Sequence, residues 1–310
     1  MNALDDPRLL PAGVQARPVL AWRGGAGLPA QPALQAQATP HAPAVQGAPH
    51  SSPSPQAPQA QPDWLADEVP VALVFNGLSH AVMMASPADL EDFALGFGLT
   101  EGLLAAPQEL FDVEAVAGPL GIELQLTVAS ACLHRLKERR RTLAGRTGCG
   151  LCGTDSLAQV RQPLPMAPAV AVAPAAIARA QRDLRQWQPV QRLTGASHAA
   201  AWCSLAGEIL LAREDVGRHN ALDKLVGAMV RAGVDPAAGF CCITSRASFE
   251  MVQKTARAGA GVLAAVSAPT ALAVDTALAC GLALAGFVRG DDLVAYTHAE
   301  RFGLAAAGTT

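Results

Sequence analysis

The sequence has few aromatic residues and few lysines. Its 310 residues include 8 Phe, 4 Trp and 1 Tyr, with three Lys against twenty Arg. With so few rings, nothing in the composition indicates a large aromatic binding surface. The formal charge of −3 at pH 7 argues against a protein that wraps a polyanion. We therefore expect no DNA or RNA partner.

We expect no secretory leader, and the sequence has no long apolar run. Its first residues, MNALDDPRLL, are acidic, whereas a signal peptide begins with positive charge followed by an apolar core. The longest candidate for a membrane-spanning segment, residues 258–274, has 17 uncharged residues but includes Pro269. Since about 20 continuous apolar residues are needed to span a bilayer, this stretch is predicted to be a buried strand followed by a helix. We expect a soluble protein with no membrane partner.

Cysteine is scarce and unevenly placed. All seven Cys lie between Cys132 and Cys280, and the odd number argues against a secreted disulfide scaffold. This usage indicates a reducing compartment, and we predict a cytoplasmic location. Five of them stand in apolar runs or at a helix start and are predicted to be structural, namely Cys132, Cys203, Cys241, Cys242 and Cys280.

Alanine is abundant, at 65 of 310 residues, and favours helices packed closely on sheets. Part of it lies in residues 24–62, which contain no charged residue and hold nine Pro, ten Ala and seven Gln. Such a tract buries too little apolar surface to offset its ordering entropy. Residues 1–62 are therefore predicted to be a disordered, low-complexity region outside the fold.

Residues 63–130 are predicted to form a small α+β subdomain. VALVF and LSHAVMMA flank Asn76-Gly77, a turn typical of hairpins because both positions require positive φ. Ser86, as a cap, and Pro87 are predicted to begin the helix PADLEDFALGFGLTEGLL. The runs FDVEAVAG and GIELQLTVA then complete a ββαββ order.

Residues 131–310 are predicted to form an α/β domain. A basic helix, ACLHRLKERRRTLAG, leads into a glycine-rich loop at 145–155, and a further helix runs from Pro174 to near Gln188. Strand-like and helical segments then alternate, from the hairpin AAAWCSL and EILLARED, through ALDKLVGAMVRAG, to LALAGFVR and LVAYTH. This alternation favours a sheet with helices on its faces.

Three polar loops, REDVGRHN, SRAS and SAPT, each follow a strand and precede a helix. If the strands are largely parallel, these loops gather at the carboxyl edge of the sheet, where open α/β folds bind ligands. Helix starts and several side chains there suit phosphate groups, namely Arg213, Arg218, Arg246, Ser245 and Ser248. Any one loop could be ordinary capping, but three on one edge favour a binding site. His219 is a candidate general base or proton donor.

Cys149-Gly150-Leu151-Cys152 is the sharpest chemical motif. Four upstream residues would favour the thiolate by lowering its pKa, namely Arg139, Arg140, Arg141 and Arg146. Three interpretations stay open. A structural zinc site needs four ligands, of which one CxxC gives two. A thioredoxin-type dithiol belongs at a strand–helix junction. A persulfide carrier needs an exposed, mobile thiolate, and the glycine-rich composition fits it best.

A zinc deaminase would carry H-x-E followed by P-C-x-x-C. His298-Ala299-Glu300 follows the CxxC instead of preceding it, and Gly148 replaces the expected proline. The order and spacing therefore exclude deaminase chemistry. No second CxxC or HxxxH completes a zinc ligand set, so no metal site is predicted within the chain.

REDVGRHNALDKLVGA closely resembles the signature segment of the FdhD family, the formate dehydrogenase accessory sulfurtransferases. The resemblance continues through GRTGCGLCGTDSL, TGASHAAAW, SRASFEMVQKTARAG, VSAPTALAV and GFVRGDDLVAYTHAER, and covers about residues 63–302 in one order. It implies a homodimer whose main domain has a sheet similar to that of cytidine deaminase.

The resemblance also implies a function. The protein would take persulfide sulfur from a cysteine desulfurase and deliver it to the molybdenum (or tungsten) cofactor bis-molybdopterin guanine dinucleotide, before that cofactor enters formate dehydrogenase. The cofactor would be carried as a substrate, with none permanently bound. Cys149 matches the persulfide cysteine of the family, and Cys152 its partner.

The cofactor-contacting segment of the family matches Phe287, Val288, Arg289, Gly290, Asp291 and Asp292. The guanine dinucleotide phosphates would then be the ligand of the polar loops, through Arg218, His219, Arg246 and Ser248. Two other hypotheses remain: a non-catalytic cofactor chaperone, and a dimer bridged by a zinc ion that takes two Cys from each chain.

Overall fold

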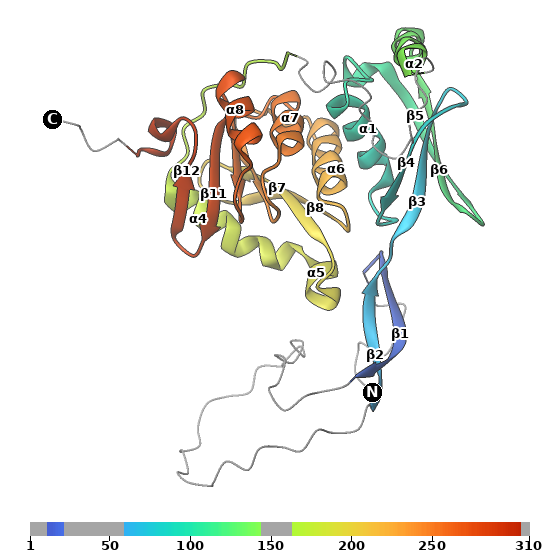
Figure 1. The fold of residues 1–310 in the computed structure, drawn as a ribbon, viewed down its shortest axis with the longest axis horizontal. Helices are drawn as coiled ribbons and strands as arrows, with labels where there is room; N and C mark the ends of the chain where they lie inside the picture. Colours follow the sequence, from blue (N-terminus) through green and yellow to red (C-terminus); the bar gives the residue numbers. More distant parts are fainter. Residues whose placement is uncertain (1–10, 22–58, 144–162, 305–310) are drawn as a thin grey trace, which may run out of the picture.

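The computed structural model describes residues 11–21, 59–143 and 163–304 (Figure 1). These residues form a mixed α/β protein whose strands build sheets of two, four and six strands. Helices cover both faces of the six-stranded sheet, in agreement with the predicted α/β sheet with helices on its faces.

The first two strands, β1 (Val14–Ala21) and β2 (Gln59–Ala66), pair antiparallel, with Val14 opposite Ala66. Residues 1–62 were predicted to lie outside the fold, and this is wrong for residues 14–21 and 59–62. Pro18 lies opposite Pro62 in the ladder. Because the two residues that lack an N–H are opposite each other, the other positions of the ladder keep their backbone donors. The tract between the two strands lies outside the described residues. Strand β2 also contacts the short helix α5 (Pro189–Thr194).

The four-stranded sheet has the order β4-β3-β6-β5. Its strands are β3 (Val69–Phe75), β4 (Leu78–Ala85), β5 (Leu110–Gly118) and β6 (Gly121–Val128), with α1 (Leu90–Thr100) and the 3-10 turn η3 (Pro107–Glu109) between β4 and β5. This is the predicted ββαββ order. The Asn76-Gly77 turn has φ values of 46° and 78°, as the hairpin required. Leu73 and Phe75 pack on Phe93 of α1 in one buried cluster.

The predicted helix cap at Ser86 is wrong. Helix α1 begins at Leu90, and its N-cap residue is Asp89 with a φ of 54°. Ser86 is instead buried against the larger unit: its Oγ accepts a hydrogen bond from the Val216 amide at 3.2 Å, and its carbonyl accepts one from Lys224 at 2.9 Å. A tertiary contact thus replaces the local one.

The six-stranded sheet has the order β12-β11-β10-β9-β7-β8. The elements of this half of the chain are α2 (Ser130–Leu143), α4 (Pro174–Asp183), η4 (Leu184–Trp187), α5, β7 (His198–Ser204), β8 (Ile209–Asp215), α6 (Arg218–Arg231), β9 (Gly239–Ile243), α7 (Phe249–Arg257), β10 (Val262–Ala265), α8 (Ala271–Ala279), β11 (Ala283–Arg289), β12 (Asp292–Ala295) and η5 (Ala299–Phe302). Strands β9, β10 and β11 are parallel, and β7 is antiparallel to both β8 and β9. Strands β8 to β11 therefore share one direction.

Helices α6, α7 and α8 pack on one face of this sheet and α4 on the other (Figure 1). Alternate residues of β9 serve the two faces: Cys241 joins the cluster with α6 and Cys242 the cluster with α4. The stretch 258–274 contains β10 and the start of α8, which is the strand-then-helix arrangement that was predicted. In the described part of the chain, no helix has the length and apolar character needed to cross a membrane.

The two larger sheets are joined by a close crossing of α1 and α6. A Cβ atom added at Gly96 would lie 1.7 Å from the Asp223 carbonyl oxygen, and one at Gly227 would lie 1.9 Å from that of Asp92. Only glycine allows this approach, which brings α1 onto the helix that begins at the carboxyl edge of the main sheet.

Candidate functional site: a basic pocket at the carboxyl edge

The parallel strands end at one pocket. Val216, Thr244, Val266 and Val288 all line it, and they lie at or directly after the ends of β8, β9, β10 and β11. Its volume is about 1220 Å³. The polar loops that follow these strands do share one edge of the sheet, as predicted: Thr270 of the third loop donates its amide to the Ala247 carbonyl of the second at 3.1 Å.

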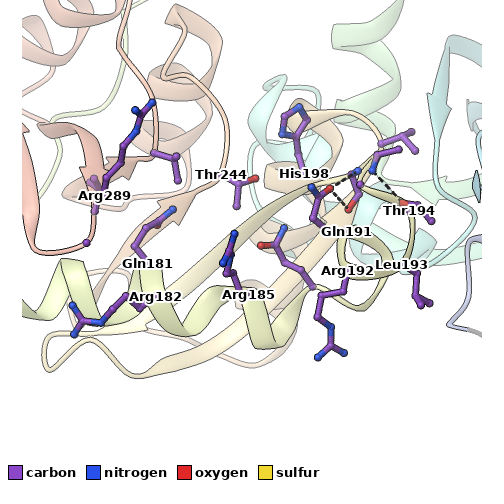
Figure 2. Close-up of a pocket in the computed structure, with 18 residues that line it drawn as sticks. Gln181, Arg182, Arg185, Gln191, Arg192, Leu193, Thr194, His198, Thr244 and Arg289 are labelled. Carbon is purple, nitrogen blue, oxygen red and sulfur yellow. Dashed lines mark hydrogen bonds between the residues drawn. The ribbon is translucent and has the colours of Figure 1, made fainter. Parts of the chain in front are cut away.

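The opposite wall comes from α4, η4, α5 and the loop that leads into β7, as Figure 2 shows. Glu214 of β8 holds this wall. Its carboxylate accepts hydrogen bonds from the Val190 and Gln191 amides, both at 2.9 Å, and from the Ser197 hydroxyl at 2.7 Å. The Gln191 side-chain oxygen accepts a further bond from the Ser197 amide at 2.8 Å. The wall is therefore fixed before any ligand binds.

The pocket is basic. Four arginines line it, and none of its lining residues is Asp or Glu (Arg182, Arg185, Arg192 and Arg289). Arg182 is paired with Asp291 at the exposed rim, whereas Arg185 and Arg192 form no ion pair with any described residue. A guanidinium group offers a planar set of donors that matches phosphate oxygens. The pocket therefore suits an anion that carries phosphate groups.

The predicted segment 287–292 runs from the end of β11 through the turn into the start of β12, and part of it lines this pocket. Val288, Arg289 and Gly290 line it. Phe287 has a φ of 51°, and its ring lies 5.9 Å from the Arg289 guanidinium. Asp292 pairs with Arg289 in the strand ladder. Residues 288–290 and the arginine wall thus line one pocket, whereas Phe287, Asp291 and Asp292 are not among its lining residues.

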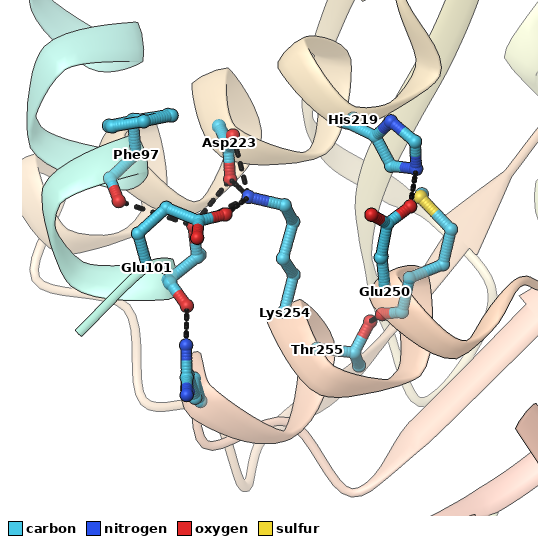
Figure 3. Close-up of polar contacts among 10 residues, drawn as sticks. Phe97, Glu101, His219, Asp223, Glu250, Lys254 and Thr255 are labelled. Atoms are coloured by element: carbon cyan, nitrogen blue, oxygen red, sulfur yellow. Dashed lines mark hydrogen bonds and ion pairs between the residues drawn. The ribbon is translucent and has the colours of Figure 1, made fainter. Parts of the chain in front are cut away.

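The other predicted phosphate ligands do not line this pocket. Arg218 and His219 open α6, and Arg246 and Ser248 precede α7, the helices that pack on the opposite face of the sheet from α4. His219 Nε2 lies 2.7 Å from the Glu250 carboxylate (Figure 3). The hydrogen bond from His219 lowers the pKa of Glu250 despite its partial burial. Ser248 is the N-cap residue of α7, but its side chain makes no capping hydrogen bond.

His198 is one of the pocket residues that sequence reasoning did not select. It is the first residue of β7 and lines the pocket between its two walls (Figure 2). Burial lowers its pKa, and the positive charges of Arg218 and His219 lower it further. Its place in TGASHAAAW, one of the segments of the family resemblance, was the available signal. The arginine wall was equally detectable, because Arg182 and Arg185 stand three residues apart in a helical segment.

Buried charges hold the helices that surround this edge. The Lys254 ammonium donates to the carboxylates of Asp223, at 2.9 Å, and Glu101, at 2.7 Å, and so joins α7 to α6 and α1 (Figure 3). Burial alone would lower the pKa of Lys254, but the two carboxylates outweigh it and raise the pKa. A second buried pair, Lys224 with Asp215 at 2.7 Å, lies beneath the start of α6. We assign these groups to the framework.

Cys149, Cys152 and Arg146 lie outside the described residues, as do the side chains of Arg139, Arg140 and Arg141. The five cysteines that were predicted to be structural are all buried, and burial raises the pKa of Cys241 and Cys280. Within the described ranges, no group of three or more His, Cys, Asp or Glu side chains is placed to hold a metal ion.

The fold and the pocket define a class: an α/β protein with a basic, phosphate-suited pocket at the carboxyl edge of its main sheet. The chain belongs to the FdhD/NarQ family, whose model matches residues 66–303, and this confirms the family resemblance read from the sequence.

Curated relatives agree with this assignment, and a solved structure shares the fold. The chain is 62% identical over 240 residues to the sulfur carrier protein FdhD of Variovorax paradoxus, covering 77% of this chain and 86% of that protein. It is 54% identical over 245 residues to the protein of the same name from Bordetella petrii, covering 79% and 88%. A crystal structure from Desulfotalea psychrophila, described as that of a candidate formate dehydrogenase accessory protein, matches the fold. Its TM-score is 0.62 at 23% identity, covering 79% of this chain and 93% of that one.

Proposed function

We propose that this protein is a cytoplasmic sulfur carrier that receives persulfide sulfur from a cysteine desulfurase and passes it to bis-molybdopterin guanine dinucleotide, the cofactor of formate dehydrogenase. The observation that carries the proposal is the pocket of about 1220 Å³ that four arginines and residues 288–290 line. The names of the relatives, sulfur carrier protein FdhD, support the sulfur chemistry.

The loading step is an exchange between two sulfur atoms. The Cys149 thiolate attacks the outer sulfur of the desulfurase persulfide. A new S–S bond forms on Cys149, the old one breaks, and the electron pair leaves with the desulfurase thiolate. No external oxidant or reductant enters this step. Arginines of the preceding helix favour the thiolate form of Cys149 because a positive charge lowers a thiol pKa.

Release of the sulfur uses the second cysteine. The Cys152 thiolate attacks the inner sulfur of the Cys149 persulfide and expels sulfide, which leaves a Cys149–Cys152 disulfide. The two thiols supply the two electrons that reduce the sulfane sulfur to sulfide. Each round then ends with a disulfide that a cellular thiol must reduce.

The pocket binds the nucleotide end of the cofactor. Arg185 and Arg192 are free of ion pairs within the described residues and are placed to bind phosphate oxygens, while Arg289 lines the pocket with its guanidinium next to the Phe287 ring. We propose that the six-stranded sheet is of the cytidine deaminase type without deaminase chemistry, and that the protein acts as a homodimer together with formate dehydrogenase.

Sulfur labelling tests the proposal. The full chain is incubated with a cysteine desulfurase and cysteine labelled with ³⁵S, and the label is located by mass spectrometry of non-reduced peptides. We expect label on Cys149 in the wild-type protein and none in Cys149→Ala. Cys280→Ala is the matched control, because Cys280 is buried, and it should label like the wild type.

Two outcomes favour other hypotheses. If the wild-type protein binds GDP but takes no label, it is a non-catalytic cofactor chaperone. If metal analysis of the purified protein gives one zinc per dimer, and Cys149→Ala removes it, the cysteines form a shared structural site.

A further inference from the structure

The backbone at His198 is held in the sheet at the pocket wall. Its neighbour Ala199 donates its amide to the Thr244 hydroxyl at 2.9 Å and accepts a bond from the Thr244 amide at 3.1 Å. On the other side of β7, His198 lies opposite Asp215 of β8 in the ladder. Its backbone is thus fixed beside β8, and the residue lines the pocket (Figure 2).

The charges around His198 are mostly positive. From α6 come Arg218 and His219, the latter paired with Glu250 of α7. Arg185 and Arg289 line the same pocket as His198. The carboxylates of β8 are engaged elsewhere. Asp215 binds Lys224, the Gly217 amide and Asn220, and Glu214 binds the Val190 and Gln191 amides and Ser197. Within the described residues, no carboxylate is free to stabilise an imidazolium at this position.

These surroundings make the charge of His198 depend on what fills the pocket. Without an anion, a proton on the imidazole would add one more positive charge to a cluster of arginines in a partly buried site. A phosphate group beside His198 in the pocket reverses this situation, because its negative charge compensates the positive charge that the proton adds.

We propose that His198 is a proton-linked phosphate ligand: its imidazole is neutral in the empty pocket, and it takes up one proton and donates a hydrogen bond to a phosphate oxygen when a nucleotide binds. The proton comes from solvent, and no covalent bond changes. This inference rests on the proposed function, since it requires that the pocket receive a nucleotide phosphate.

The sign of the pH dependence follows. Burial and the neighbouring cations hold the pKa of free His198 below its usual value, and a bound phosphate raises it. Affinity for the nucleotide therefore increases as the pH falls through the interval between the two pKa values. Uptake of one full proton gives about a tenfold gain in affinity per pH unit, which is the upper limit of the effect.

Calorimetry with GDP tests this on the full-length protein. Binding is measured between pH 6 and 8.5 in two buffers that differ in ionisation enthalpy, so that the number of protons taken up is obtained directly. We expect net uptake by the wild-type protein and an affinity that rises as the pH falls. His198→Gln keeps a hydrogen-bonding amide but cannot be protonated, and it should lose both the uptake and most of the pH dependence.

His134→Gln is the matched control. His134 is exposed on α2, where it pairs with Glu138, and its removal should leave proton uptake unchanged. Protonation of GDP itself is common to all three proteins and cancels in the comparison.

The possible failures are distinguishable. Wild-type protein that binds GDP without proton uptake overturns the role of His198 and leaves the proposed pocket function intact, and this result does not depend on any variant folding. Equal uptake by wild type and His198→Gln places the proton elsewhere and also overturns it. Absence of GDP binding at every pH refutes the proposed nucleotide site itself.

Discussion

Removing the charge of Asp215 should destabilise the protein strongly. Asp215 and Lys224 are both fully buried, and their charged atoms lie 2.7 Å apart. The same carboxylate accepts hydrogen bonds from the Ser86 and Gly217 amides, at 2.9 and 2.8 Å. Asp215→Asn keeps the size of the side chain but leaves the Lys224 ammonium without its counter-charge in a site that water does not reach.

The magnitude follows from that burial. Breaking a buried ion pair by removing one partner costs about 3–5 kcal/mol, because the remaining charge stays desolvated. At about 2–4 °C per kcal/mol for a chain of this size, the melting temperature should fall by about 6–20 °C. Asp215→Asn with Lys224→Met removes both charges but leaves the Ser86 carbonyl without its donor, which costs about 1–3 kcal/mol. The double variant should thus be more stable than Asp215→Asn alone.

Urea unfolding followed by circular dichroism measures these differences. The control is Asp183→Asn, because Asp183 is an exposed carboxylate 3.8 Å from Arg179, and its effect should stay within about 0.5 kcal/mol. The reasoning is refuted if Asp215→Asn costs less than about 1 kcal/mol, or if the double variant is the less stable of the two.

Two further predictions concern the pocket and the start of α7. Arg185→Ala should weaken GDP binding about tenfold or more, because it removes charge-assisted hydrogen bonds. Arg179→Ala, six residues earlier in the chain and outside the pocket wall, should bind normally in the same calorimetric titration, and equal losses would point to general surface charge. Since the pKa of Glu250 is lowered in the folded state by His219, the stability that it contributes is present above its unfolded pKa and is lost as the pH falls through its folded pKa. The difference in unfolding free energy between wild type and Glu250→Gln should therefore be larger at pH 6 than at pH 3, and a constant difference would contradict the pairing.

Local sequence signals predicted most elements of the fold. The Asn76-Gly77 turn requires positive φ at both positions, which the structure has, and the alternation of apolar runs with amphipathic segments located the helices that follow β8, β9 and β10. The carboxyl edge was also predictable, because parallel strands bring the loops that follow them to one side.

Contacts distant in sequence decided the rest. Ser86 looked like a helix cap, but its amide and carbonyl bind residues 129 and 138 positions away, and no local pattern reports such partners. Helix α5 has only six residues, too few for a periodic signal. It is placed by Glu214, which lies 23 and 24 positions along the chain from the amides that it binds. The arginine wall of the pocket depends on that contact.

The division of the predicted phosphate ligands has a physical cause in the turns that leave each strand. After β8 and β9 the chain enters α6 and α7, and both helices pack on the sheet face that carries Cys241. The residues at the starts of these helices, such as Arg218 and Ser248, therefore lie toward that face. After β11 the chain turns directly into β12 without a helix, so residues 288–290 stay beside α4 on the other face, where the pocket lies. All these residues lie at or after the end of a strand, and so at one edge of the sheet. Which face of the sheet they lie on depends on how the helix or strand that follows them packs. His198 is the first residue of β7, which is antiparallel to β8 and β9. It therefore lies at the edge where those two strands end. There it lines the pocket, and the charges of Arg218 and His219 on α6 lower its pKa.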